Sequence, residues 1–148
     1  MDDYFCVLDP CENTNGQNYP AVITNPTFTG SATGWSLGLD WSYSANTVVG
    51  TSGSYANSTS VFEQNKYYKI SITVVSIVGT LDVYIESVFL GSISSVGTHD
   101  FYGFADTLLS TGYLVICPQT DGATACLSNV TSFEILTEFR IVLYDSNV

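Results

Sequence analysis

The chain has 148 residues, of which 45% are hydrophobic and only 11% charged, and its formal net charge is −11. This length predicts one domain with a substantial core, and normal hydrophobic content with few charges argues against intrinsic disorder. Three basic residues cannot neutralise a run of phosphates, so we expect no direct nucleic-acid binding and no membrane binding. No apolar stretch approaches the roughly 20 residues of a membrane span.

The balance of residue types favours strands over helices. Val, Ile and Thr together number 41, against 25 for Ala, Leu, Glu and Lys. β-branched side chains pack well on pleated strands and lose rotamer freedom in helices. The composition therefore predicts an all-β protein.

The first segment of the chain does not resemble core. Residues 9–18 are turn formers without hydrophobic periodicity, so we predict an irregular N-terminal arm or loop over 1–20, followed by a β-sandwich over 21–148. An arm of this composition buries too little surface to order by itself, and we expect it to dock on a partner subunit. The expected apolar anchors are Tyr4, Phe5, Val7 and Leu8.

The four cysteines form two local pairs, Cys6 with Cys11 and Cys117 with Cys126. The N-terminus is acidic where a secretory signal needs a basic and then an apolar segment, so we expect synthesis in the cytoplasm with reduced thiols. The spacings also allow one or two disulfides, or a zinc ion held by four thiolates, although zinc knuckles are usually closer. Free thiols are favoured, the alternatives stay open, and the sequence assigns no metal site or cofactor.

From residue 21 onward, short apolar runs alternate with turns. Alternation over 35–43 predicts one strand, and a Ser- and Gly-rich stretch over 50–57 predicts an exposed loop. The clearest strand, 67–77, is followed by Gly79-Thr80 and a strand over 81–88, so we expect these two strands to pair antiparallel. Further strands are predicted at 89–93, 99–105, 113–117, 126–130, 133–136 and 139–144. About ten short strands predict an antiparallel β-sandwich of jelly-roll type.

Several motifs, individually weak, follow one another in an informative order. They are Asn25-Pro26-Thr27-Phe28-x-Gly30, Gly34-Trp35, Trp41, Tyr68-x-Ile70-x-Ile72-x-Val74, Leu114-x-Ile116-x-Pro118 and Asn129-Val130-x-Ser132-Phe133-x-Ile135. This order resembles carbohydrate-binding-module-like jelly rolls of the galactose-binding-like type over about residues 21–137. The resemblance implies the fold more than a ligand.

Domains of this family also occur in structural proteins of tailed bacteriophages, whose Ser-, Thr- and Asn-rich, base-poor composition this chain shares. We therefore expect a virion protein, most simply a decoration protein attached to the capsid, with the major capsid protein as partner and tail or neck proteins as alternatives. A surface with few charges and ten tyrosines lowers the desolvation cost of such assembly. The alternative is a carbohydrate-binding module displayed on the virion to recognise host glycans.

For glycan recognition, the candidate residues surround one predicted strand. Trp41 and Tyr43 could stack against sugar rings, with Asp40 and Asn46 bonding hydroxyl groups, whereas we expect Trp35 in the core.

Catalysis is not indicated. His99 and Asp100 are adjacent in a strand and point to opposite faces, so they cannot act as a base and its orienting acid. The sequence contains no Asp-rich loop of EF-hand type that would indicate a calcium site. We expect no enzymatic activity.

Overall fold

The computed structural model describes residues 5–11, 23–51, 53–58, 62–105, 112–119, 122–135 and 138–144. These residues form strands and contain no helix capable of spanning a membrane. The strands are β1 (Phe5–Cys11), β2 (Trp35–Leu37), β3 (Trp41–Ser44), β4 (Thr47–Thr51), β5 (Ala56–Ser58), β6 (Lys66–Val78), β7 (Leu81–Ile85), β8 (Val88–Ile93), β9 (Gly97–Ala105), β10 (Leu114–Pro118), β11 (Thr124–Ile135) and β12 (Glu138–Tyr144).

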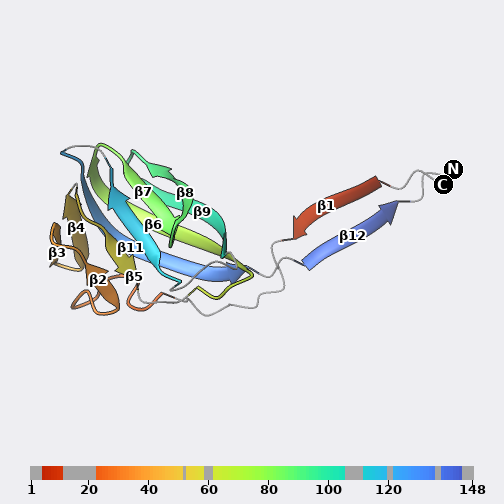
Figure 1. The fold of residues 1–148 in the computed structure, drawn as a ribbon, viewed down its shortest axis with the longest axis horizontal. Helices are drawn as coiled ribbons and strands as arrows, with labels where there is room; N and C mark the ends of the chain where they lie inside the picture. Colours follow the sequence, from red (N-terminus) through yellow and green to blue (C-terminus); the bar gives the residue numbers. More distant parts are fainter. Residues whose placement is uncertain are drawn as a thin grey trace.

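Most of these strands build two five-stranded sheets that face each other (Figure 1). The sheet named here the β6 sheet has the order β3-β4-β11-β6-β9, and the β7 sheet has the order β2-β5-β10-β7-β8. All pairings in both sheets are antiparallel. The predicted all-β sandwich of jelly-roll type is confirmed.

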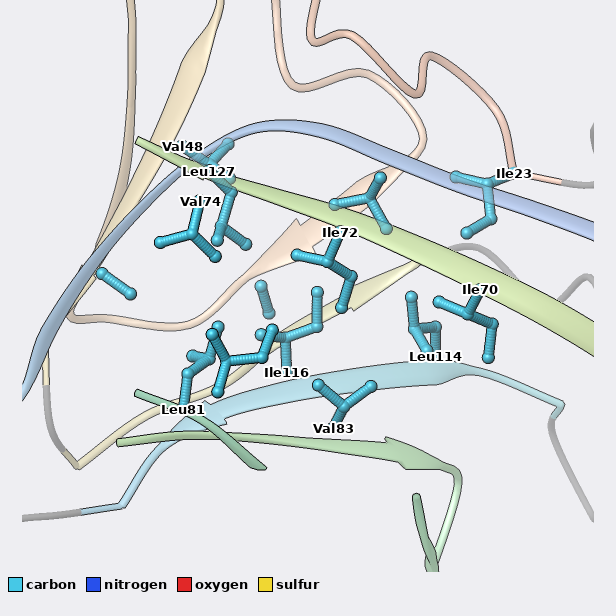
Figure 2. Packing of buried hydrophobic residues seen from close by; sticks show 14 of the residues in the cluster. Ile23, Val48, Ile70, Ile72, Val74, Leu81, Val83, Leu114, Ile116 and Leu127 are labelled. Carbon is cyan, nitrogen blue, oxygen red and sulfur yellow. The ribbon is translucent and has the colours of Figure 1, made fainter. Parts of the chain in front are cut away.

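The core lies between the sheets and is built from alternate residues of the strands (Figure 2). In β6, every second residue from Tyr68 to Val74 is buried, as the alternation in the sequence predicts. The β7 sheet contributes the fully buried side chains of Leu81, Val83, Ile85, Leu114 and Ile116. Burial of each such side chain stabilises the fold by about 1.5–3 kcal/mol, so this layer is the main source of stability.

The predicted pairing of 67–77 with 81–88 is wrong. β6 pairs with β9 and β11, whereas β7 pairs with β8 and β10 in the other sheet. Gly79 has a φ of +79°, and the turn at this residue carries the chain from one sheet to the other. The alternation of apolar residues specifies which face of a strand is buried but not which strand lies beside it. Two strands that face one core from opposite sheets therefore show the same sequence pattern as two strands of a hairpin.

The predicted strand over 35–43 is divided into β2 and β3, which belong to different sheets. The chain turns at Gly38, whose N–H donates to the carbonyl of Tyr55 at 3.0 Å. A Cβ on Gly38 would lie 2.8 Å from that carbonyl oxygen, so only glycine permits this approach. The stretch expected to be an exposed loop also contributes the end of β4 and most of β5.

The structure differs from the expected irregular arm at residues 5–11, which form β1. This strand pairs antiparallel with β12, with Val7 opposite Val142 and Leu8 opposite Ile141. The physical reason is that apolar, strand-favouring residues occupy both segments, so pairing outweighs the turn formers Asp9 and Pro10, which lie within β1. Figure 1 shows this two-stranded ribbon beyond one end of the sandwich. Tyr4 and the rest of the predicted arm lie outside the described residues.

The cysteines of the second pair stand in opposite sheets, Cys117 on β10 and Cys126 on β11. Both carry free thiols, so no disulfide joins them in this structure. Burial raises the pKa of the Cys117 thiol, which keeps it protonated. Cys6 and Cys11 both lie on β1, where only the backbone is described.

Candidate functional site: the outer face of the β6 sheet

Trp41, the main predicted sugar-stacking residue, is part of the core. Only 5% of its surface is exposed, because β3 turns this side chain inward. Its ring fills the space above Gly50 on β4, where a Cβ would lie 2.2 Å from the ring atom Cε2. The ring therefore has no face available to a ligand. Trp35 also packs on the core, 5.3 Å from the ring of Phe28.

The other predicted glycan-binding residues do not form one site. Tyr43 is half-buried against the core, and its hydroxyl donates to Asn46 Oδ1 at 3.2 Å. Asn46 Oδ1 also accepts the N–H of Gly30 at 2.9 Å, so this amide holds two loops together. Asp40 precedes β3 and Asn46 follows it, at opposite ends of the strand.

A different set of aromatic residues gathers on the outer face of the β6 sheet. Their exposed fractions are large for aromatic side chains: 39% for Tyr67, 56% for Tyr102, 37% for Phe104 and 38% for Phe133. They come from the adjacent strands β6, β9 and β11. We call these four residues the aromatic face.

The strand register explains why these residues meet. Tyr67 is directly opposite Phe104, and Lys69 is opposite both Tyr102 and Phe133 on its two neighbouring strands. The Tyr67 and Phe104 rings lie 4.7 Å apart between centroids, and Lys69 Nζ lies 5.7 Å from the centre of the Tyr102 ring. Because Tyr68 is turned into the core, Tyr67 and Lys69 must face outward.

Polar groups continue the same face along β6 and β9. Asp100 Oδ2 lies 3.3 Å from Lys69 Nζ, and Ser71 Oγ donates to Asp100 Oδ1 at 2.5 Å. One row further, the hydroxyls of Thr73 and Thr98 are hydrogen-bonded at 2.9 Å. Aromatic rings thus border a strip of charged groups and hydroxyls.

The charges on this strip are mutually stabilised. The hydrogen bond from Ser71 and then the contact with Lys69 lower the pKa of the Asp100 carboxyl. The hydrogen bond with Asp100 in turn raises the pKa of Lys69. At neutral pH the face therefore presents an ionised carboxylate and an ammonium group within hydrogen-bond reach of each other.

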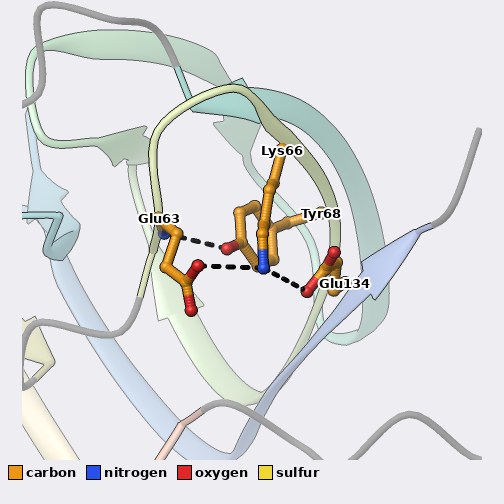
Figure 3. Close-up of polar contacts among 4 residues, drawn as sticks. All are labelled: Glu63, Lys66, Tyr68 and Glu134. Carbon is orange, nitrogen blue, oxygen red and sulfur yellow. Dashed lines mark hydrogen bonds and ion pairs between the residues drawn. The ribbon is translucent and has the colours of Figure 1, made fainter.

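An ion-pair cluster joins the strands that carry Tyr67 and Phe133 (Figure 3). Lys66 Nζ lies 2.9 Å from a carboxylate oxygen of Glu63 and 3.0 Å from one of Glu134. The hydrogen bonds with Glu63 and then Glu134 raise the pKa of Lys66. Because Lys66 precedes Tyr67 and Glu134 follows Phe133, the cluster holds β6 and β11 together beside the aromatic face.

Tyr68 anchors the same cluster from within the core. Its buried hydroxyl accepts the N–H of Glu63 at 2.8 Å, and its ring meets Phe62 edge-on, 4.7 Å between centroids. Burial raises the pKa of this phenol, which keeps it neutral. The segment before β6 is thereby fixed to the start of the strand.

The sequence analysis missed the aromatic face, because each member was read only as a strand residue. One signal was present in the sequence. Aromatic residues occupy both faces of the strands at Tyr67-Tyr68 and Phe101-Tyr102-Gly103-Phe104, whereas only one face of each strand packs on the core, so some of these rings must face outward. What sequence alone did not reveal is that β6 lies between β9 and β11.

Comparison with known proteins establishes the fold class. No protein-family profile and no curated protein matches the chain. Among solved structures, the chain is similar to a family 29 carbohydrate-binding module (TM-score 0.53, 13% identity, 79% of this chain and 88% of that chain). A variant of such a module gives a TM-score of 0.54 at 12% identity, with 79% of this chain and 91% of that chain covered.

A further variant, complexed with cellulohexaose, gives a TM-score of 0.55 at 12% identity and covers 79% of this chain and 90% of that chain. At such low identity these likenesses show that the chain has the β-sandwich of carbohydrate-binding modules. They extend the resemblance seen in the sequence to the arrangement of the strands.

Replacing Trp41 by Ala should lower the free energy of unfolding by about 3–5 kcal/mol, because it empties a large core site. Gly50→Ala should also destabilise, since its Cβ would overlap the Trp41 ring. In the double variant the destabilisation caused by Gly50→Ala should largely disappear, because the Trp41 ring is absent. Urea unfolding should therefore show a loss of stability smaller than the sum of the two single losses.

The control for this cycle is Ser42→Ala, an exposed position on the same strand, which should change stability by less than about 0.5 kcal/mol. Additive losses in the double variant would contradict the contact between the ring and Gly50.

The pKa of Asp100, followed by its carboxyl NMR signal, should lie below the usual 3.8. Ser71→Ala should raise the pKa of Asp100, because the hydrogen bond from Ser71 is the main cause of its lowered value. Because the pKa of Asp100 is lower in the folded than in the unfolded protein, the ionised carboxylate stabilises the folded state. This stabilisation is complete above the unfolded pKa and is lost as the pH falls through the folded pKa.

Thr73→Ala is the matched control, because Thr73 bonds to Thr98 instead of Asp100. An unchanged titration of Asp100 in the Ser71 variant would contradict the assigned cause.

Proposed function

We propose that this domain binds glycans on the outer face of the β6 sheet. The observation that carries the proposal is the convergence of four exposed aromatic residues beside the Lys69–Asp100 ion pair. The apolar face of a pyranose ring packs well on an aromatic ring, and its hydroxyls exchange hydrogen bonds with charged and hydroxyl side chains. Both kinds of partner lie next to each other here.

The chemistry of this face favours binding without turnover. Glycoside hydrolysis needs two carboxyl groups across the scissile bond, one of them protonated at working pH. Asp100 is ionised and paired with Lys69, and Glu134 is paired with Lys66. We therefore assign this face a role in glycan recognition, and we assign it no catalytic step.

The fold comparison supports this proposal, since the similar structures are carbohydrate-binding modules and one of them is complexed with cellulohexaose. Cellulohexaose is accordingly the first probe for this chain. The proposed face differs from the site predicted around Trp41, because that side chain is buried.

A place in a virion remains a prediction from the family resemblance and the composition, and the fold comparison adds no support for capsid, tail or neck partners. The predicted anchors Phe5, Val7 and Leu8 lie on β1, whose ribbon with β12 extends beyond one end of the sandwich. Attachment through β1 and glycan binding by β6, β9 and β11 would use different strands.

A glycan array that includes cellulohexaose should identify ligands for the wild-type protein, with affinities then measured by calorimetry. Tyr102→Ala should weaken binding roughly two- to tenfold, because one stacking contact is worth about 0.5–1.5 kcal/mol. Phe104→Ala should act in the same direction.

Phe89→Ala provides the matched control. Phe89 is an aromatic residue with the same exposed fraction as Tyr102, 56%, but it lies on β8 in the other sheet. Its replacement should leave glycan affinity unchanged. Equal losses from Phe89→Ala and Tyr102→Ala, or no glycan bound by the wild-type protein, would refute the proposed site.

A further inference from the structure

A concave surface lies near β3, at the edge of the β6 sheet opposite to β9, and is separate from the aromatic face. It is a depression of about 370 Å³ lined by Ser36 and by two turns, residues 38–40 between β2 and β3 and residues 53–55 between β4 and β5. We call it the loop depression. It adjoins β3, the edge strand of the β6 sheet farthest from β9, and includes no residue of the aromatic face.

The two turns are held together by hydrogen bonds of backbone groups with each other and with one side chain. Besides the Gly38–Tyr55 bond, the N–H of Asp40 donates to Ser54 Oγ at 3.1 Å, and the N–H of Thr51 donates to the Asp40 carbonyl at 3.0 Å. Gly53 adopts a φ of +107°, which favours glycine. The depression is thus shaped before any ligand arrives, and little ordering entropy opposes binding.

Its lining combines apolar surface with hydrogen-bonding groups. Leu39 is fully exposed, and Tyr55 is 55% exposed. Among the described residues, none bonds to the carboxylate of Asp40, which lines the same depression. A ligand with one apolar face and several hydroxyl groups would cover Leu39 and Tyr55 and donate hydrogen bonds to the Asp40 carboxylate.

We propose that the loop depression is a second carbohydrate site, which takes one or two neutral pyranose residues, such as the end of a glycan chain. The volume lies at the low end of the range for small-molecule sites, which suits a short saccharide better than a long chain. Asp40 and a net charge of −11 disfavour acidic sugars. The inference extends the proposed function to a separate surface, and each can fail alone.

The test is an NMR titration of the wild-type protein with the methyl glycosides of glucose, galactose and mannose, and separately with sialic acid. At least one neutral glycoside should shift the amide signals of Gly38, Asp40, Gly53 and Tyr55 saturably, with a Kd on the order of 1 mM. Any shift of the Tyr67 and Tyr102 amides should follow a separate saturation curve, because the aromatic face is a separate surface. Sialic acid should leave the loop signals unchanged.

Two variants identify the contacts. Tyr55→Ala and Asp40→Asn should each weaken the loop interaction roughly three- to tenfold. Both positions are exposed, so the remaining amide signals should show an intact fold. Tyr102→Ala should leave the loop interaction unchanged, while Tyr55→Ala should leave binding at the aromatic face unchanged.

No saturable shift of the loop amides with any neutral glycoside, or equal shifts with sialic acid, would overturn the second site. If cellulohexaose still binds and Tyr102→Ala weakens it, the proposed function survives that failure. If the loop amides respond and the aromatic face binds no glycan, the second site stands and the proposed function fails.

Discussion

The two-sided character of β6 is the constraint on which the rest of the structure depends. Every second side chain from Tyr68 to Val74 is sealed against the β7 sheet. Since successive residues of a strand point to opposite faces, this burial fixes the outward direction of Tyr67 and Lys69. The hydrophobic core thereby also positions the candidate site, and a one-residue slip in register would exchange the two faces.

The sequence allowed prediction of the buried faces but not of the strand neighbours. The alternation in β6 identifies Ile70 and Ile72 as core, because a half-buried strand requires it. That β6 lies between β9 and β11 depends on long-range packing, which local pattern does not encode. The division of the 35–43 strand likewise depends on Tyr55, whose carbonyl approaches Gly38 from distant sequence.

The candidate site was harder to predict than the fold for a related reason. Tryptophan is the residue type most expected to stack on sugars, yet Trp41 serves the core above a glycine on the neighbouring strand. The exposed rings come from three strands whose adjacency only the folded sheet creates. Of the predicted set, Asp40 alone lines a surface proposed to bind a ligand, and it does so with Tyr55 instead of Trp41.

The antiparallel ribbon of β1 and β12 has a mechanical consequence. Phe5 and Tyr144 are paired at its outer end, and Cys11 and Glu138 at its inner end. Tension applied to both strands at the outer end loads the backbone hydrogen bonds one pair after another, as in unzipping, instead of shearing them together. Under such tension the ribbon would therefore open pair by pair before load reaches the longer β6–β11 pairing of the sandwich.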